Sequence, residues 1–275
     1  MKKGKKIGII GGGFVGSAAA FGFGSSNIVD FDIKVYDKDP HKSSHSLQET
    51  VLDSDFIFLC VGTPSLKDGT IDLSQIDEAF SEIVSLGDLS EKIFIIKSTV
   101  VPGTCRHFCK KYQLPVVSNP EFLTERRAKW DFINAAQVVI GSDDGLSGDR
   151  VRDLYRQRFT NMKYIMVDTI TSEFIKYMLN CYFSVKVSFM NEMRQISDSM
   201  GISWEDAVGA FVSDSRIGDS HVQVPGPDGK FGFGGHCFPK DINAMIHFAK
   251  NLNLKPTVLE AAWSKNLEVR EKSKV

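Results

Sequence analysis

Short apolar runs alternate with stretches of helical periodicity in the first half of the chain. Runs rich in β-branched residues are typical of buried strands, and amphipathic stretches between them are typical of helices. Such alternation predicts a doubly wound parallel sheet with helices on both of its faces. The predicted strands cover residues 6–10, 33–36, 56–61, 93–97, 116–118 and 138–140.

The pattern changes after about Asp168. From residue 171 to residue 200 apolar side chains recur at helical spacing, and residues 257–271 also have a helical pattern. The sequence therefore predicts an α/β fold in two domains. The first, over residues 1–168, contains the sheet, and the second, over residues 169–275, is smaller and all-helical.

A glycine-rich turn follows the first predicted strand. Residues 11–16 read Gly-Gly-Gly-Phe-Val-Gly, which is a GxGxxG pattern. Its glycines permit a tight turn, close approach of a pyrophosphate and close packing of helix on strand, while the helix N-terminus attracts phosphate. This indicates a Rossmann-type dinucleotide domain. Its predicted cofactor contacts are Gly11, Gly13, Phe14, Val15 and Gly16.

Asp37 ends the second predicted strand, 21 residues after Gly16. A carboxylate at this position can accept hydrogen bonds from the adenosine ribose and repels a 2′-phosphate. Lys38 softens that repulsion, but the carboxylate decides the preference, so we predict NAD rather than NADP. The alternative is a glycine-rich turn in some other α/β fold.

Composition narrows the classes of function. With 42% hydrophobic residues, 24% charged residues and a net charge of -1, the chain has no electrostatic reason to bind nucleic acid or an anionic membrane. Glycines interrupt the apolar run of residues 7–23, which makes it a poor membrane helix. The five scattered cysteines favour free thiols, and no metal-ligand spacing occurs. We expect a metal-free cytoplasmic protein.

Several further segments, in order and through nearly the whole chain, resemble the UDP-glucose/GDP-mannose dehydrogenase family. They are 61–64 with 68–69, 97–100 with 102–104, 119–125, 173–176 with 180, 189 with 191–192, and 232–241. The resemblance implies an NAD-dependent oxidation of the C6 alcohol of a nucleotide sugar to a uronic acid. UDP-glucose is the first expectation, while GDP-mannose and UDP-N-acetylated sugars stay open.

Residues after the third and fourth predicted strands lie where open α/β sheets bind ligands. Gly62, Thr63 and Pro64 follow the third strand and suit the nicotinamide ribose, although these residues taken alone favour a loop-capping Thr-Pro turn. The resemblance adds Thr99, Glu125 and Lys240 to the cofactor contacts. The substrate contacts that it implies are Phe122, Leu123, Lys176, Asn180, Phe231 and Gly234.

The resemblance also implies the catalytic roles. Glu121 and Thr99 would orient the hydrolytic water, and Lys176 and Asn180 would stabilise oxyanions. From the residues alone, Glu121 and Glu125 could simply cap a helix beginning near residue 122. Lys176 and Asn180 could equally form the solvated face of a helix. Arg126 stands where many members have glycine, so we expect a different local backbone.

Cys237 stands in a glycine-dense segment and is followed by Lys240 and Asp241. Glycines let the backbone fold around a substrate, and a nearby lysine favours the thiolate. By resemblance, Cys237 is the nucleophile of a thiohemiacetal and then a thioester, and Asp241 holds the water or the lysines. His236 could help to ionise the thiol or could point outward.

Members of the family continue into a second α/β domain that holds the nucleotide of the substrate, and we expect this chain to lack it. It would then be a fragment, a natural short form completed by a partner chain, or a degenerate member. A non-enzymatic NAD-binding or assembly protein on the same scaffold stays open, as does a hydroxyacid dehydrogenase, which needs no cysteine. The resemblance implies a homodimer through the helix at 171–200, which could otherwise be a core helix.

Overall fold

The computed structural model describes residues 2–272, so the predicted domain limits at residues 1 and 275 lie outside the described residues. The chain divides into two compact units. Unit 1 contains Met1–Pro64 and Ile71–Lys176, and unit 2 contains Ser65–Thr70 and Tyr177–Val275. The domain boundary that the sequence predicts between residues 168 and 169 falls at the start of helix α7 (Thr169–Met200), eight residues before this division.

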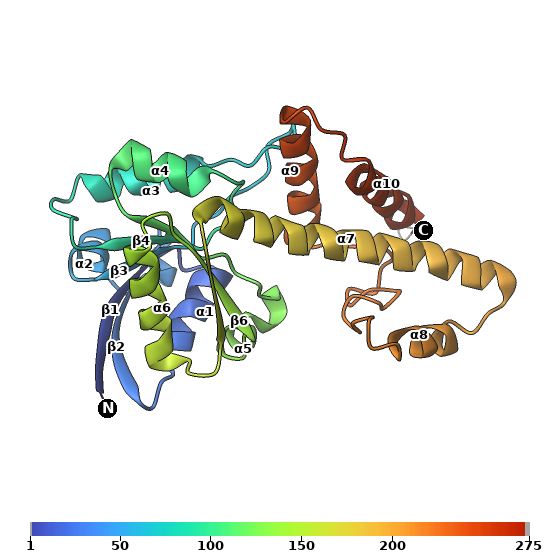
Figure 1. Ribbon diagram of the computed structural model, residues 1–275, viewed down its shortest axis with the longest axis horizontal. Coiled ribbons are helices and arrows are strands. Elements are labelled where there is room, and N and C mark those ends of the chain that lie inside the picture. The colour runs from blue at the N-terminus through green and yellow to red at the C-terminus, as the bar shows by residue number, and fades with distance from the viewer. Residues whose placement is uncertain (1, 273–275) are drawn as a thin grey trace. The chain divides into compact units, whose positions relative to one another are not determined.

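Unit 1 is built around a seven-stranded sheet with the order β2-β1-β3-β4-β5-β6-β7 (Figure 1). The neighbouring strands are parallel except β5 and β6, which pair antiparallel through Ser118 and Gly141. The predicted doubly wound sheet is confirmed, and β7 is a strand that the sequence pattern did not predict. The strands are β1 (Lys2–Ile10), β2 (Val29–Tyr36), β3 (Phe56–Leu59), β4 (Ile93–Ile96), β5 (Val116–Ser118), β6 (Gln137–Gly141) and β7 (Lys163–Val167).

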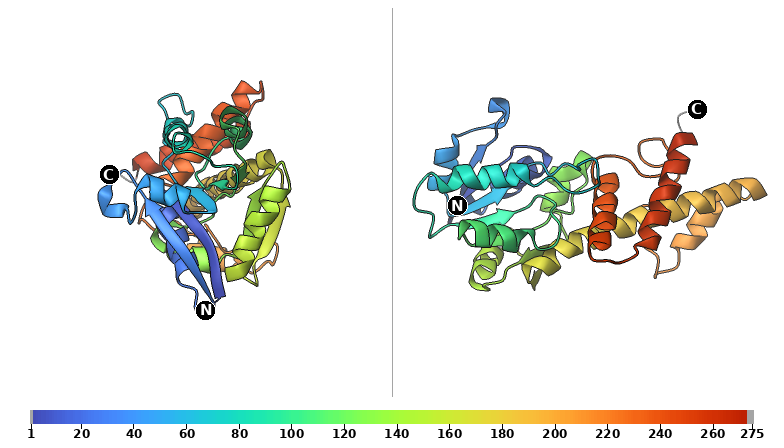
Figure 2. Two further views of the ribbon diagram at one scale, coloured as in Figure 1. Left: turned by 90° about the vertical axis from the view of Figure 1, so that its left-hand side faces the viewer. Right: turned by 90° about the horizontal axis from the view of Figure 1, so that it is seen from above.

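Each face of the sheet has its own apolar core, because successive strand residues point to opposite faces. Phe56 and Phe58 of β3 belong to one core, and Ile57 and Leu59 belong to the other. Helices α1, α5 and α6 cover the first face, and α2, α3 and α4 cover the second (Figure 2). These helices are α1 (Phe14–Gly24), α2 (Leu47–Leu52), α3 (Ser74–Val84), α4 (Thr104–Tyr112), α5 (Ala128–Ile133) and α6 (Leu146–Arg158).

Unit 2 contains most of α7 together with α8 (Trp204–Val212), α9 (Cys237–Asn251) and α10 (Thr257–Lys272). The two helices predicted over residues 171–200 and 257–271 are confirmed as α7 and α10. Met190 of α7, Trp204 of α8 and two valines of the loop after α8, Val222 and Val224, form an apolar core. Within the described part of the chain, every helix is too short or too polar to span a membrane.

Candidate functional site

The turn between β1 and α1 is packed too closely for side chains at three of its glycines, and a Cβ on Gly12 would lie 2.7 Å from the Lys42 carbonyl oxygen. Gly11 has a φ of 97°, and a Cβ there would lie 2.6 Å from the Cys60 carbonyl oxygen. A Cβ on Gly16 would lie 1.9 Å from the Gly11 carbonyl oxygen, so α1 can approach β1 only without a side chain at this position. A Cβ on Gly13 would meet nothing within 4 Å, which leaves open space before the first turn of α1.

Asp37 follows β2 and turns towards the same glycines. Its Oδ2 accepts a hydrogen bond from the Gly12 amide at 2.6 Å, and its Oδ1 accepts one from the Asp39 amide at 2.8 Å. Gly13, the N-cap residue of α1, has no side chain to occupy the first amides of the helix. Lys38 is exposed and forms an ion pair with Glu78 at 2.6 Å.

These residues fit a dinucleotide. The close-packed glycines and the uncapped start of α1 suit a pyrophosphate, and the Asp37 carboxylate suits the hydroxyls of an adenosine ribose. The pyrophosphate would be held by Gly11, Gly13, Phe14, Val15 and Gly16.

The segments after β3 and β4 are tied together. The Thr63 hydroxyl donates to the Thr99 carbonyl oxygen at 2.9 Å, and the Ser98 hydroxyl donates to the Val61 carbonyl oxygen at 2.7 Å. Thr63 is buried, while its neighbours Gly62 and Pro64 are exposed. The structure therefore brings Thr63 and Thr99 together at the carboxyl edge of the sheet.

A buried ion pair joins Glu121, just after β5, to Lys176 on α7. The Lys176 Nζ lies 3.0 Å from the Glu121 Oε1, and both side chains are 4% exposed. The Glu121 Oε2 also accepts a hydrogen bond from the Leu123 amide at 2.6 Å, and the Lys176 Nζ lies 5.6 Å from the centroid of the Phe122 ring. The interpretation of Lys176 as part of a solvated face is wrong, because its ammonium group is buried against a carboxylate.

The interpretation of Glu121 and Glu125 as caps of a helix beginning near residue 122 is also wrong. Residues 121–124 form no helix, and Glu125 begins the short 3-10 turn η2 (Glu125–Arg127), which contains Arg126. Glu125 is exposed, whereas Glu121 is buried. Because Pro120 precedes Glu121 and the Glu121 side chain binds the Leu123 amide, this segment runs as a loop.

Lys97 is a second buried lysine, to which the sequence assigned no role. Its Nζ donates to the Asn119 Oδ1 at 3.0 Å and to the Tyr155 hydroxyl at 3.4 Å, and the residue is 4% exposed. Burial lowers the pKa of Lys97 to about 8, although the nearby Cys60 and Glu121 act in the opposite direction. A lysine that directly follows an apolar strand run was the signal available in the sequence.

A cavity of about 590 Å³ lies beside the first turn of α1. It is lined by Phe14 and Ser17 of α1 and by residues 125–130. The structure thereby brings together Phe14 and Glu125, two of the predicted cofactor contacts, with Arg126 beside them.

A polar cluster in unit 2 is centred on Asp241 of α9, which is 0% exposed. Its Oδ2 accepts a hydrogen bond from the Asn180 Nδ2 at 2.5 Å, and its Oδ1 accepts one from the Lys240 Nζ at 2.6 Å. Cys237 is the first residue of α9, one turn before Asp241, so the two side chains share a face of the helix. The prediction that Cys237 lies within the loop is wrong by one residue, because the loop ends at the exposed His236.

The glycine-rich loop before α9 is fixed by α10. The Arg270 Nε donates to the Phe233 carbonyl oxygen at 2.9 Å, and a Cβ on Gly234 would lie 1.8 Å from the Arg270 Nη2. Phe231 packs against the apolar core of unit 2. Phe231 and Gly234 thus have packing roles, and their contacts with substrate stay predictions.

All five cysteines are free thiols, and burial raises the pKa of Cys60 and of Cys181 to about 12. Those two thiols are therefore neutral near pH 7. Among the side chains of the described residues, no group of three His, Cys, Asp or Glu could hold a metal ion.

Lys176 and Asn180 lie four residues apart on α7, and each is bound to a buried carboxylate, Glu121 or Asp241. Side chains at this spacing share a face of a helix. The Lys176 ammonium group of unit 1 and the Asn180 amide of unit 2 are each of a kind that can donate a hydrogen bond to a developing oxyanion. A cysteine at a helix N-terminus can act as a nucleophile, because the helix stabilises its thiolate.

Two family models match the chain. Residues 42–159 match the NAD binding domain of the UDP-glucose/GDP-mannose dehydrogenase family, and residues 170–268 match the central domain of the same family. The first match begins after the glycine turn, so the assignment of that turn to NAD binding rests on its own packing geometry.

The relatives and solved structures similar to this chain carry related names. The chain is 35% identical over 226 residues to UDP-glucose 6-dehydrogenase of Rickettsia bellii, which covers 80% of this chain and 51% of that protein. It is 33% identical over 233 residues to GDP-mannose 6-dehydrogenase of Pseudomonas aeruginosa, covering 80% and 52%. A UDP-glucose dehydrogenase structure from Pyrobaculum islandicum has a TM-score of 0.85 and 27% identity, covering 96% of this chain and 68% of that one. The chain spans about half the length of the curated relatives.

Proposed function

Since the chain belongs to the UDP-glucose/GDP-mannose dehydrogenase family, we propose that it forms the NAD-binding and catalytic parts of a nucleotide-sugar dehydrogenase. The NAD-binding domain of this family implies NAD as the cofactor. The proposed reaction is the four-electron oxidation of a sugar C6 alcohol to a uronic acid. UDP-glucose is the first candidate substrate and GDP-mannose the second, after the names of the relatives described above.

The arrangement on α7 is the observation that carries the proposal. Lys176 and Asn180 are buried, lie one turn apart and each bind a buried carboxylate. Burying an ammonium group, an amide or a carboxylate costs free energy. Charged groups buried at this cost are concentrated at sites that stabilise charge during a reaction. We therefore assign to each side chain the stabilisation of an oxyanion of the reaction.

Cys237 is the proposed nucleophile. Its position at the start of α9, with Lys240 three residues later, favours the thiolate. The sulfur attacks the aldehyde carbon and forms a C–S bond, while the carbonyl oxygen becomes an oxyanion that accepts hydrogen bonds from Lys176 and Asn180. Asp241 holds Asn180 and Lys240 in place. Two NAD molecules, bound one after the other, would supply the hydride acceptors, the first for the alcohol and the second for the thiohemiacetal that becomes the thioester.

Glu121 is the proposed base of the hydrolytic half-reaction. A water molecule oriented by Thr99 gives its proton to the Glu121 carboxylate and attacks the thioester carbon. The C–S bond then breaks, and the thiolate of Cys237 leaves with its electron pair. The Lys176 ammonium group beside Glu121 holds the carboxylate in place before the proton transfer.

The remaining contacts are part of the same proposal. Beyond the glycine turn and Asp37, the cofactor contacts are Lys38, Gly62, Thr63, Pro64, Thr99, Glu125 and Lys240. The substrate contacts are Phe122, Leu123, Lys176, Asn180, Phe231 and Gly234. We assign the reaction to the cytoplasm, because five free thiols, the proposed nucleophile Cys237 among them, suit a reducing compartment.

We also propose a homodimer formed through α7. Exposed apolar side chains on this helix fall within a stripe of about 80° when residues are placed 100° apart. An apolar stripe of this kind marks an interaction surface. The stripe consists of Phe174, Met178, Tyr182, Phe189, Ile196 and Met200.

Trapping the covalent intermediate tests the function. With UDP-glucose and NAD present, a Glu121→Gln variant should accumulate an acyl adduct on Cys237, because formation of the thioester continues while its hydrolysis slows. Peptide mass spectrometry locates the adduct. Cys237→Ser should carry none, and Cys109→Ser, which changes an exposed cysteine, should leave it intact. An adduct on another cysteine, or none with either candidate sugar, would reject the proposal.

A further inference from the structure

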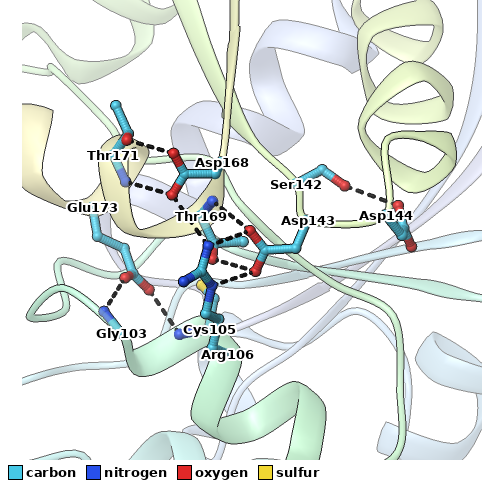
Figure 3. Close-up of polar contacts among 10 residues, drawn as sticks. All are labelled: Gly103, Cys105, Arg106, Ser142, Asp143, Asp144, Asp168, Thr169, Thr171 and Glu173. Atoms are coloured by element: carbon cyan, nitrogen blue, oxygen red, sulfur yellow. Dashed lines mark hydrogen bonds and ion pairs between the residues drawn. The ribbon is translucent and has the colours of Figure 1, made fainter.

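A polar network in unit 1 ties the first turns of α7 to α4 (Figure 3). The Glu173 Oε2 accepts a hydrogen bond from the Gly103 amide at 2.5 Å, and its Oε1 accepts one from the Cys105 amide at 2.7 Å. Amides at the start of a helix have no carbonyl partner within that helix. Glu173, which is 2% exposed, therefore caps α4 from a different helix.

A second set of contacts holds the same end of α7. The Asp168 carboxylate caps the helix by accepting from the Thr171 amide at 3.1 Å and from the Thr171 hydroxyl. The Asp143 carboxylate accepts from the Thr169 hydroxyl at 2.8 Å and from the Arg106 guanidinium at 2.8 and 3.0 Å. Figure 3 shows Arg106 of α4 between Asp143 and Asp168. The start of α7 is thus held to α4 at two places.

The two segments that the Glu173 carboxylate joins each contain or adjoin a proposed catalytic residue. Gly103 closes the loop that begins at Thr99, whose carbonyl oxygen is bound by Thr63. Lys176 follows Glu173 by three residues on α7 and reaches the Glu121 carboxylate. One buried carboxylate therefore connects the backbone near Thr99 with the turn of α7 that presents Lys176.

We propose that Glu173 is a positioning residue, whose carboxylate fixes the loop from Thr99 to Gly103 against the turn of α7 that carries Lys176. The inference rests on the proposed function for the roles of Thr99 and Lys176, whereas the mechanical connection rests on the hydrogen bonds alone. A side chain misplaced by about 1 Å can lower a rate by roughly 100-fold, so such a connection matters for the chemistry.

The connection depends on pH. Burial raises the pKa of Glu173 to about 7, while the Cys105 thiol and the two amides act in the opposite direction. The charged and titratable groups that face Glu173 are Cys105 and Arg106 from α4 and Asp143 from the loop after β6. A protonated carboxyl turns one of its two oxygens into a donor, so one of the two amides loses its acceptor. The contact is complete above pH 7 and weakens as the pH falls through that value.

Amide hydrogen exchange tests the connection without requiring turnover. Protection factors, corrected for intrinsic exchange rates, are measured at pH 6 and pH 8 for the chain, for Glu173→Gln and for Asp144→Asn. Asp144 is a matched control, because its carboxylate caps α6 through the Ser147 amide at 2.8 Å. We expect Glu173→Gln to lower protection at least fivefold at pH 8 in residues 103–108 and 173–180. Asp144→Asn should lower it only near residues 146–151.

At pH 6 the unaltered chain should show the same lowered protection factors as Glu173→Gln. The protection factors of Glu173→Gln should be the same at pH 6 and at pH 8. Equal protection in the chain and in Glu173→Gln at pH 8 would overturn the inference. A loss of protection that extends to the core strand β3 would also overturn the inference, because the Glu173 carboxylate would then stabilise the whole of unit 1 and not only the contact between α7 and the loop from Thr99 to Gly103.

Turnover gives a second readout. With UDP-glucose and NAD, Glu173→Gln should lower kcat at least 10-fold with little change in the KM for NAD. In the unaltered chain kcat should fall as the pH drops below about 7, and Glu173→Gln should abolish this acid limb of the pH profile. Glu173→Asp should restore part of kcat and the acid limb. An unchanged kcat would overturn the inference. If neither the chain nor its variants turn over, the proposed function fails for the isolated chain, and the exchange measurement still decides the role of Glu173.

Discussion

At the residue scale, four charged side chains are buried among the described residues of unit 1, namely Lys97, Glu121, Glu173 and Lys176. Glu121 and Lys176 are 55 residues apart in the sequence. The family resemblance implied roles for Glu121 and Lys176. That these two side chains form an ion pair could not be predicted, because their contact depends on where β5 and α7 meet. Lys97 had no assigned role, since its Asn119 and Tyr155 partners are also distant in sequence.

Removing one member of the Glu121–Lys176 pair should be far more damaging than removing both. Lys176→Met leaves a buried carboxylate without its counter-charge, which typically costs about 3–5 kcal/mol. Adding Glu121→Gln should recover at least half of that loss. Denaturant unfolding of the two single variants and the double variant measures the coupling. Additive losses would show that the two side chains do not stabilise each other.

Lys97→Met should change stability in a pH-dependent way. The pKa of Lys97 is about 8 in the folded chain and 10.5 ordinarily, so between these pH values the unfolded chain binds more protons. The stability of the unaltered chain therefore rises with pH in this window. The free energy of unfolding of Lys97→Met, relative to that chain, should fall by about 2 kcal/mol from pH 7 to pH 10. A difference independent of pH would contradict the buried, shifted lysine.

At the element scale, six strands, α7 and α10 could be predicted because their apolar runs and periodicities are strong. Strand β7 was missed although residues 164–167 are a continuous apolar run, because a short run directly before a long helical pattern cannot be distinguished from a helix segment by periodicity alone. The antiparallel pairing of β5 and β6 has no signature in the sequence of either strand. The start of α9 at Cys237 was hidden by the glycines and by Pro239, a residue that is tolerated in the first turn of a helix.

Alanine substitutions at two glycines of the turn before α1 should distinguish an effect on stability from an effect on cofactor binding. Gly16→Ala places a Cβ against the Gly11 carbonyl oxygen, so it should lower both the Tm and the affinity for NAD. Gly13→Ala meets open space, so it should keep the Tm and weaken NAD binding at least 10-fold. Calorimetry gives both quantities. Unchanged NAD affinity in Gly13→Ala would place the pyrophosphate elsewhere.

At the scale of the whole molecule, the exposed stripe on α7 predicts self-association. Tyr182→Lys places a charge in the middle of the stripe and should shift a dimer to the monomer in light scattering after size exclusion. Leu146→Lys changes another exposed apolar side chain, on α6, and should leave the dimer intact. A chain that is monomeric at every concentration, or a dimer that survives Tyr182→Lys, would contradict the proposed interface.

The chain spans about half the length of its curated relatives and carries the proposed catalytic residues within that half. Counting the NADH formed per sugar consumed, with NAD and UDP-glucose and then with NAD and GDP-mannose, tests the thioester route most directly. We expect two NADH per sugar with one of the two sugars, and no acid product from Cys237→Ala. One NADH per sugar, or an unchanged yield of acid from Cys237→Ala, would contradict the thioester route.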